Sequence, residues 1–326
     1  MNMHPMWEQY PDIKRDLIDV LTVIDKNITI KDKQARKTVI DLLHAGGKLL
    51  RPAFFILMAQ TGKTYDREQI IHVAASVEVL HMASLIHDDI IDEADTRRGM
   101  PTVASQFGSK YALYTGDYLF CVCFKILAKF ADALATIEFN TNTVEKILMG
   151  ELNQMQSRYN MNMTVKSYLS QISKKTAALF ALSCQMGAQL GGHEPMEKMM
   201  AKKIGHEVGM AFQILDDILD YTESADLIGK PVLEDMKQGV YSLPLIYAMK
   251  QNPAAFEELL MKKDELTDSD AKEIVRLIHA SGGIDYAQKI AMKYTDKATG
   301  RIKRLPESEA KRILLALTEQ LLLRKM

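Results

Sequence analysis

Two short clusters of aspartates are the residues of this sequence best suited to chemistry. One lies in LIHDDIIDEAD and the other in QILDDILDYTE; the six acids are Asp88, Asp89, Asp92, Asp216, Asp217 and Asp220. On a helix, residues four apart project from one face about 5–6 Å from each other, so the first and third acids of each cluster would lie together. Two unit charges ~6 Å apart repel by about 3 kcal/mol at an effective dielectric near 20. A bound cation removes that cost, so each cluster predicts a metal site.

The second cluster repeats the first after 216 − 88 = 128 residues, a distance too long for a solenoid repeat. We therefore expect the two clusters to face each other across one site. Oxygen donors without histidine or cysteine favour Mg²⁺ over Zn²⁺, and Mg²⁺ typically joins one or two carboxylates to substrate phosphates. The alternative, a solvated helix face, explains one such cluster more readily than two with the same internal spacing.

Other metal-binding patterns fit less well. DDIIDEADTRRG lacks the alternating acids, the glycine and the final acid of a calcium loop. His206-Glu207 is not followed by the second histidine of a zinc-protease helix. The order His81, His87-Asp88 is compatible with a helical HD-type metal phosphohydrolase, which stays open as an alternative. Such a hydrolase would not need the second acidic cluster.

A phosphate-bearing substrate also needs positive side chains around its remaining oxygens. Lys48 and Arg51 stand three apart in GGKLLRP, which predicts that they share one turn of helix. Lys174-Lys175-Thr176 is expected to open a helix, because apolar AALFAL follows it. His81, about two turns before Asp88, is a candidate hydrogen-bond donor to phosphate. The cations next to the acidic clusters are Arg97, Arg98 and Lys230.

The elements that position these side chains are predicted to be helices. Apolar residues recur at three- and four-residue intervals, and no window alternates as a strand would. We expect an all-α, single-domain helical bundle over residues 1–326, with breaks at the glycine and proline clusters. The longest apolar-looking stretch, Ala177–Gly192, is interrupted by polar residues and is too short to span a membrane.

Composition limits the classes of partner. Lysine plus arginine (41) nearly balances aspartate plus glutamate (42), which argues against a nucleic-acid or membrane-surface protein. Three cysteines make no metal or disulfide framework, and the N-terminal residues do not read as a signal peptide. A cytoplasmic protein without stable membrane insertion is expected.

Several motifs, in order along the chain from Gly46 to Pro244, resemble those of the trans-prenyl diphosphate synthases. They are GGKLLRP, EVLHMASLIHDDIIDEADTRRGMPT, GDYLF, GEL…Q, KKTAALF, FQILDDILD and GKP…SLP. The resemblance implies an all-α bundle with a central cavity. It also implies a reaction in which isopentenyl diphosphate is condensed with an allylic diphosphate, for which farnesyl diphosphate is the expected primer. No dedicated base is required, because the departing diphosphate can take the proton.

The same resemblance implies a role for each candidate residue. The six aspartates would bind Mg²⁺ and, through it, the allylic diphosphate, which Arg97, Lys175 and Lys230 would also contact. Isopentenyl diphosphate would be held by Lys48, Arg51, His81 and Arg98. Thr176 and Gln213 would face the reacting carbons. The DDILD form of the second motif resembles chain-elongating synthases rather than terpene cyclases.

The residues before Asp88 bear on product length. Ala83 and Ser84 are small where short-chain members of the family carry bulky aromatics, and Leu80 and Val77 lie deeper along the same helix. We expect a product of about six or seven isoprene units, by analogy with the family, for a quinone side chain. Leu80 is expected to act as a partial stop.

The stretch after the second cluster departs from the family. Leu233 stands where glycine is common and Val240 where lysine is common, so one diphosphate contact is missing or moved, with Lys237 as a candidate replacement. The departure resembles the large catalytic subunit, component II, of bacterial hexaprenyl or heptaprenyl synthases, which works with a small non-catalytic subunit. A homomeric synthase, or homodimer, and a non-catalytic partner subunit stay open as alternatives.

Overall fold

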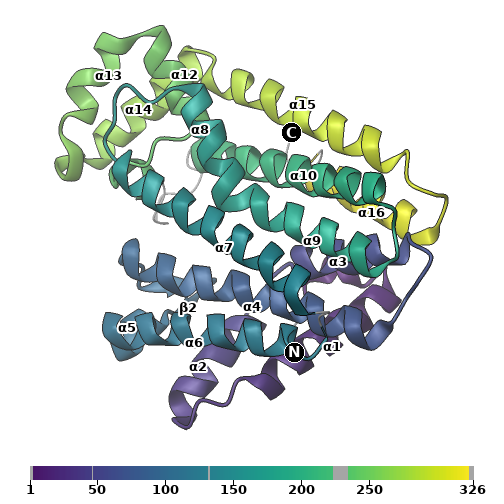
Figure 1. Ribbon diagram of the computed structural model, residues 1–326. Coiled ribbons are helices and arrows are strands. Elements are labelled where there is room, and N and C mark those ends of the chain that lie inside the picture. Colours follow the sequence, from purple (N-terminus) through teal and green to yellow (C-terminus); the bar gives the residue numbers. More distant parts are fainter. Residues whose placement is uncertain (1–2, 46, 131–132, 223–233, 323–326) are drawn as a thin grey trace. The chain divides into compact units, whose positions relative to one another are not determined.

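The computed structural model describes residues 3–45, 47–130, 133–222 and 234–322, and almost every regular element in them is helical (Figure 1). The prediction of an all-α protein is confirmed. The sequence did not indicate one exception, a two-residue antiparallel pair in which Thr96 is opposite Pro101 and Arg97 is opposite Met100. The predicted breaks at Gly62, Gly108, Gly191-Gly192 and Gly282 fall between helices.

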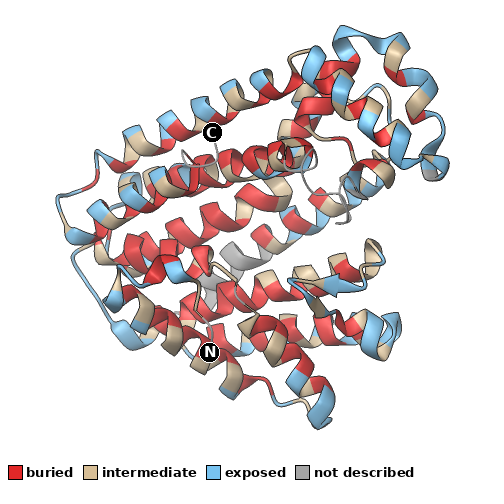
Figure 2. Cartoon of the chain, turned by 180° about the vertical axis from the view of Figure 1, so that it is seen from behind, coloured by how far each residue is buried: buried red, intermediate tan, exposed pale blue. Residues whose placement is uncertain are grey.

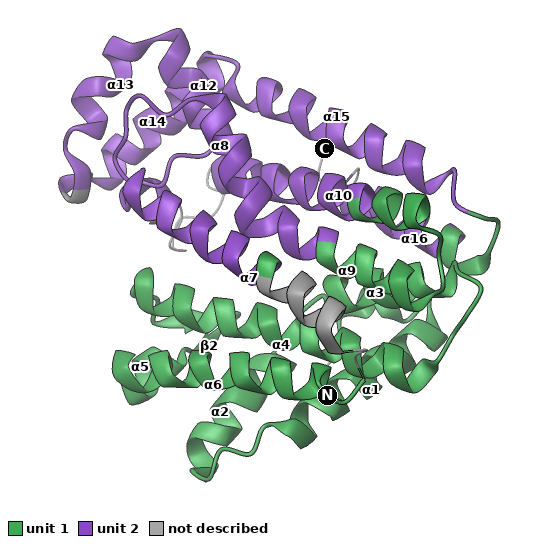
Figure 3. Ribbon diagram, in the orientation of Figure 1, with its two compact units in different colours: residues 1–142, 182–202, 306–311 green, residues 143–181, 203–305, 312–326 purple. Residues whose placement is uncertain are grey.

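The chain forms two compact units, coloured in Figure 3. Unit 1 comprises residues 1–142, 182–202 and 306–311, and unit 2 comprises residues 143–181, 203–305 and 312–326. That the chain forms a single domain stays a prediction.

The elements wholly within unit 1 are η1 (Pro5–Trp7), α1 (Pro11–Asn27), α2 (Lys33–His44), α3 (Leu50–Gln60), α4 (Arg67–Ile91), β1 (Thr96–Arg97), β2 (Met100–Pro101), α5 (Val103–Phe107) and α6 (Ser109–Leu127). Those wholly within unit 2 are α8 (Val165–Ile172), the π turn η2 (Ser173–Ala177), α11 (Glu234–Lys237), α12 (Leu243–Gln251), α13 (Pro253–Leu260), η4 (Lys263–Glu265), α14 (Asp268–Ala280) and α15 (Gly283–Ile302). Residues of both units occur in α7 (Ala133–Gln156), α9 (Ala178–Leu190), α10 (Pro195–Thr222) and α16 (Glu309–Leu322).

Helix α4 is the central helix of unit 1. It packs along α6 and also contacts α1 and α3 (Figure 1). It begins where the side chain of Asp66 accepts a hydrogen bond from the amide of Gln69, a regular N-cap. Its apolar residues are largely buried, and Figure 2 colours buried residues of the chain red.

Among the described residues, α4 is also the helix that is long and apolar enough to cross a membrane by length and composition. From the sequence, the longest apolar stretch is expected elsewhere, at Ala177–Gly192. In the structure, 72% of the apolar window of α4 is buried inside the protein, as expected for a core helix. Its apolar character is therefore explained by packing.

In unit 2, residues 203–222 of α10 pack against the helical segment that contains the π turn η2. Glu207 on α10 is buried and accepts two hydrogen bonds from Nε of Arg301 on α15, at 3.0 and 2.8 Å. Close packing at Gly209 brings α10 against the π turn: an added Cβ there would lie 2.6 Å from Cα of Ala177. These contacts hold the segment of α10 that leads to the second aspartate cluster.

Candidate active site

The first aspartate cluster lies at the C-terminal end of α4. Asp92 is the C-cap, and its amide donates to the carbonyl of Asp88 at 2.8 Å. The predicted spacing of one helical turn therefore holds, although the helix ends at Ile91 rather than continuing through the cluster. Glu93 then takes a left-handed φ of 49°, which turns the chain away from the helix axis.

A tight turn brings the following arginines back toward α4. Arg98 and Gly99 have φ of 54° and 75°, the positive values that a two-residue hairpin turn of the I′ type needs at both central positions. The turn joins β1 to β2, and it places Nε of Arg97 2.5 Å from Oδ1 of Asp89. In this structure Arg97 therefore pairs with an aspartate of the first cluster.

The three acids of the first cluster have different surroundings. Asp88 and Asp92 are partly accessible, whereas Asp89 is buried beside Arg97. Burial raises the pKa of Asp89, and the positive charge of Arg97 opposes that rise. Asp88 and Asp92 thus remain partly accessible to solvent, while Asp89 is buried against a protein cation.

Four side chains of unit 1 whose charges interact define a candidate anion-binding group, the anion cluster: Arg51, Glu78, His81 and Arg98. On α4, Glu78 and His81 lie about three and two turns before Asp88. Burial lowers the pKa of Arg51 to about 10, which leaves it charged at neutral pH. Burial also lowers the pKa of His81 well below 6.5, and the charges of Arg51 and Arg98 lower it further, so the imidazole is neutral. For Glu78, burial raises the pKa and the same two arginines lower it. Two arginines facing one carboxylate leave a surplus of positive charge, which suits a phosphate.

The GGKLLRP motif shapes this cluster. An added Cβ at Gly47 would lie 2.5 Å from the guanidinium of Arg98, so a side chain there would displace that guanidinium. The prediction that Lys48 and Arg51 share one turn of helix is wrong. Leu49 takes a left-handed φ of 49° as the N-cap of α3, so Lys48 precedes the helix that carries Arg51. The indole of Trp7 donates to the carbonyl of Lys48 at 3.0 Å and anchors this loop.

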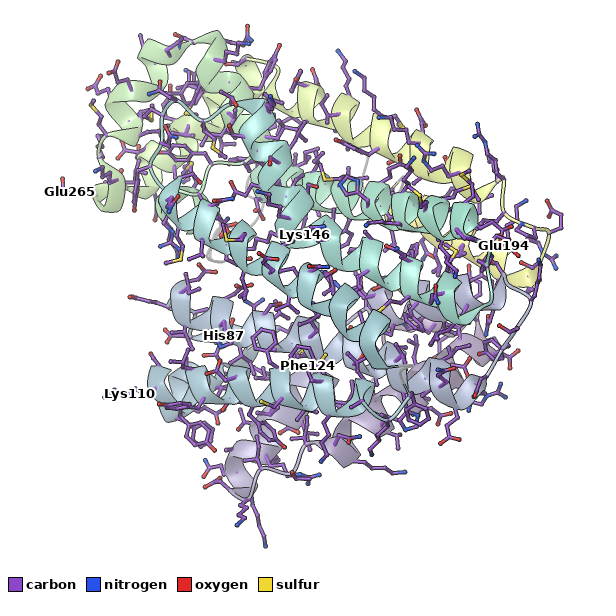
Figure 4. The ribbon with its side chains drawn as sticks, viewed as in Figure 1. His87, Lys110, Phe124, Lys146, Glu194 and Glu265 are labelled. Carbon is purple, nitrogen blue, oxygen red and sulfur yellow. The ribbon has the colours of Figure 1, made fainter. Side chains whose placement is uncertain are left out.

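His87 is turned toward α6 rather than toward the anion cluster. Its ring stacks on Phe120 with centroids 5.5 Å apart, and its Nε2 lies 3.3 Å from Oδ1 of Asp117. An added Cβ at Gly116 would lie 2.5 Å from that Nε2, so this glycine makes room for the ring. Figure 4 shows His87 on α4 beside α6. His81 and His87 thus lie in different surroundings, which counts against the phosphohydrolase alternative.

In unit 2, Lys175 and Thr176 lie in the π turn η2, in the middle of a long helical segment. The prediction that they open a helix is wrong. Nζ of Lys175 lies 2.8 Å from Oε2 of Glu151 and 2.7 Å from Oε1 of Gln154, both on α7. The hydroxyl of Thr176 donates to Oε1 of Gln213 at 2.7 Å. Single π turns occur frequently at functional sites, because the extra residue changes which way neighbouring side chains point.

The three acids of the second cluster have the same pattern of exposure as those of the first. Asp216 and Asp220 are exposed, and Asp217 is buried. Its Oδ1 accepts from Nε2 of Gln213 at 2.8 Å, and its Oδ2 accepts from the hydroxyl of Tyr168 at 2.5 Å. Burial raises the pKa of Asp217 to about 8, although both hydrogen bonds act to lower it. The pKa of Tyr168 is raised well above 10 by its own burial and by Asp217, so the phenol remains a donor.

Both clusters therefore present two accessible outer acids and one buried, partnered middle acid. Among the described residues, no three carboxylate, imidazole or thiol side chains come close enough to hold a metal ion by themselves. A cation at either cluster would need oxygens from another source, as Mg²⁺ does when it takes substrate phosphates. Lys230, Leu233 and Gly46 lie outside the described residues.

The residues proposed to set product length lie along α4. Ser84 is partly accessible and shares the face of Asp88, four residues on, whereas Ala83 is fully buried. Leu80 and Val77 are buried deeper along the helix, at 3% and 1% exposure. The partly accessible residues His81, Ser84 and Asp88 thus follow one another along α4, whereas Leu80 and Val77 are buried.

Comparison with known proteins decides the family. The model of the family described as polyprenyl synthetase matches residues 32–278. The chain belongs to the polyprenyl synthetase family. It is therefore a prenyltransferase, and the predicted family and enzyme class are confirmed.

This polyprenyl synthetase is similar to the following three proteins, among others. Heptaprenyl diphosphate synthase component 2 of Bacillus subtilis is 36% identical over 286 residues, 88% of this chain and 81% of that protein. A geranylgeranyl pyrophosphate synthase of Lactobacillus brevis matches with a TM-score of 0.94 and 38% identity, covering 98% of this chain and 99% of that one. A polyprenyl synthase of Caulobacter crescentus, complexed with calcium and isoprenyl diphosphate, matches with a TM-score of 0.88 and 27% identity, covering 96% of each chain.

One residue of this polyprenyl synthetase, Tyr168, was missed in the sequence, and the surroundings of Lys237 and Val240 were left open. Tyr168 was not singled out, although it stands seven residues before Lys175 in the same helical segment, a spacing of two turns. Lys237, the candidate replacement for a missing diphosphate contact, lies 3.1 Å from Oδ1 of Asp268. Val240 donates its amide to the carbonyl of Asp235 at 2.7 Å.

Proposed function

We propose that this polyprenyl synthetase extends an allylic diphosphate, farnesyl diphosphate, with isopentenyl diphosphate to an all-trans hexaprenyl or heptaprenyl diphosphate. One observation carries the proposal: in both aspartate clusters the first and third acids are accessible, and the middle acid is buried and held in place. The outer acids are accessible to a cation from solvent, and the buried middle acid is fixed by its contacts within the protein. The product would supply a quinone side chain.

The donors fit Mg²⁺. Asp88, Asp92, Asp216 and Asp220 offer only carboxylate oxygens, and hard cations of the Mg²⁺ and Ca²⁺ type prefer oxygen ligands. The Caulobacter crescentus structure, which is complexed with calcium and isoprenyl diphosphate, supports a role for a divalent cation. When bound, Mg²⁺ would neutralise charge on the diphosphate and favour its departure.

The protein side chains would divide the substrates between them. The surplus positive charge of the anion cluster, together with Lys48, would hold isopentenyl diphosphate. Lys175 and Lys230 would contact the allylic diphosphate, whose oxygen takes up the electron pair when the allylic carbon–oxygen bond breaks. The double bond of isopentenyl diphosphate then forms the new carbon–carbon bond, and a proton is lost to the departing diphosphate. Fixed cations and dipoles that stabilise this developing negative charge lower the barrier.

A small non-catalytic subunit is the proposed partner. Four apolar residues of α7, which define the apolar stripe, are each about half exposed: Leu148 47%, Met149 46%, Leu152 52% and Met155 48%. Their spacing places them along one side of the helix. The name component 2 of the Bacillus subtilis relative supports a second component for that enzyme. Methionine-rich apolar surface adapts readily to a partner.

A chain-elongation assay tests the proposal. Radiolabelled isopentenyl diphosphate, farnesyl diphosphate and Mg²⁺ should yield labelled polyprenyl diphosphate of thirty or thirty-five carbons, measured by mass. Phosphate release without carbon–carbon bond formation would refute it. A twenty-carbon product would instead follow the geranylgeranyl synthase relative and refute the proposed length.

The partner is tested by adding the companion component of the Bacillus subtilis enzyme. Activity that appears or rises with that component supports the two-component form, and full activity of the chain alone supports a homomeric synthase or homodimer. Leu152→Glu should abolish the activation. The matched control is Met261→Glu, at an apolar residue that is 66% exposed outside the apolar stripe. Cytoplasmic localisation and the absence of membrane insertion stay predictions that cell fractionation can check.

A further inference from the structure

His206 on α10 makes a contact that the proposed chemistry does not use. Its Nε2 lies 2.8 Å from Oγ of Ser173, the first residue of the π turn. His206 is half-buried, and its neighbour Glu207 is held by Arg301. The dipeptide drew attention in the sequence only as an incomplete zinc-protease pattern, and the structure gives its histidine a different partner.

The contact belongs to a pair that brackets the point where the π turn crosses α10. Gly209 lies against Ala177 at that point. Three residues before Gly209, His206 bonds Ser173, and four residues after it, Gln213 bonds Thr176. Residues seven apart are two turns apart on one helix face, so His206 and Gln213 approach the same turn from the same side. Ser173 and Thr176, the first and last polar residues of the π turn, are thus both bonded to α10.

A π turn needs such attachment because it is a rare departure from regular α-helix. Reverting to α-helical geometry would rotate the side chains on one side of the turn by about 100° relative to those on the other. Lys175 and Thr176 would then no longer point toward Glu151 and Gln213. Holding Ser173 opposes that change without touching either residue.

We propose that His206 is a positioning residue, which holds the π turn through Ser173 so that Lys175 and Thr176 keep their orientation. The inference rests on the proposed roles of Lys175 and Thr176 in the transfer. It concerns geometry on this chain, and it assigns no proton transfer to the imidazole.

Steady-state kinetics with farnesyl diphosphate, isopentenyl diphosphate and Mg²⁺ test the proposal. His206→Ala and Ser173→Ala should each lower kcat by about 10-fold, while KM changes by less than about twofold, because small misplacement of positioned groups mainly costs turnover. Ser173→Ala removes a single oxygen from a partly accessible residue, so its fold should survive, as thermal unfolding would show. The double variant should be no slower than either single variant, since both remove the same contact.

Rescue separates positioning from a general structural role. The side-chain amide of glutamine can stand in for imidazole Nε2, so His206→Gln should restore kcat, but only while Ser173 is present. The matched control is His72→Ala, which removes a histidine whose Nδ1 lies 2.8 Å from the carbonyl of Glu68 on its own helix; its kcat should not change. Unchanged kcat in His206→Ala, or a loss that glutamine does not restore, would overturn the proposal.

Lys175→Ala distinguishes this inference from the proposed function. If Lys175→Ala is slow and His206→Ala is not, the positioning role fails and the proposed function stands. If Lys175→Ala keeps full turnover, the proposed role of the π turn fails and the role of His206 fails with it.

Discussion

Product length should respond most strongly to substitution at Ser84. Ser84 shares the accessible face of α4 with Asp88, and Leu80 lies buried one turn deeper. At a rise of about 1.5 Å per residue, the step from Leu80 to Ser84 is about 6 Å along the helix. An isoprene unit adds four chain bonds, which advance about 5 Å when extended. Ser84→Phe should therefore shorten the product by about one isoprene unit. The bulk of the ring can remove a second unit.

The opposite change tests the same reasoning. In Leu80→Ala the side chain that limits the growing product would be Val77, about 4.5 Å deeper along the helix. The product should therefore lengthen by about one isoprene unit. Because Leu80 is buried, this variant should also lose about 2–5 kcal/mol of stability, so its product must be measured below its unfolding temperature.

The assay is mass analysis of dephosphorylated products made from farnesyl diphosphate with excess isopentenyl diphosphate. Ala83→Phe is the comparison variant, because Ala83 is fully buried and lies off the face of Asp88. It should shorten the product less than Ser84→Phe and cost about 1–3 kcal/mol through overpacking. A larger shortening from Ala83→Phe, or an unchanged product in Ser84→Phe, would refute the assignment of the accessible face as the path of the growing chain.

Three further predictions concern the acids and the anion cluster. Asp88→Ala should lower kcat by about 100-fold or more with little change in thermal unfolding, since this acid serves a cation rather than packing; unchanged turnover would rule out the metal site. Tyr168→Phe should lower the free energy of unfolding by about 1–3 kcal/mol in urea titration, because Asp217 loses a hydrogen bond in a buried setting; equal stability would mean that the bond is not formed in solution. Below pH 6.5 the unfolded chain protonates His81 and the folded chain does not, so stability falls as pH falls, by up to about 1.4 kcal/mol per pH unit. His81→Gln should flatten that fall, and parallel stability curves for the two proteins would contradict the burial of a neutral imidazole.

The reasoning from sequence succeeded where local pattern and residue type carry the information. Helical apolar spacing predicted the all-α fold, and glycine and proline clusters predicted breaks between helices. It was wrong about Lys48 and about Lys174-Lys175-Thr176, because a left-handed Leu49 and a π turn are backbone states that several sequences can adopt. The hairpin that returns Arg97 to Asp89 was missed because each strand is only two residues long.

The sequence alone determined the two matching aspartate clusters and the cations that follow them along the chain, and the resemblance of its motifs to a known family implied the class of reaction. Only the tertiary structure decided the surroundings of each acid. Asp89 and Asp217 are the buried acids because Arg97 in one case, and Tyr168 and Gln213 in the other, are brought against them by folding. Burial, pKa and hydrogen-bond partners depend on neighbours in space, and neighbouring aspartates in one motif can therefore have opposite roles.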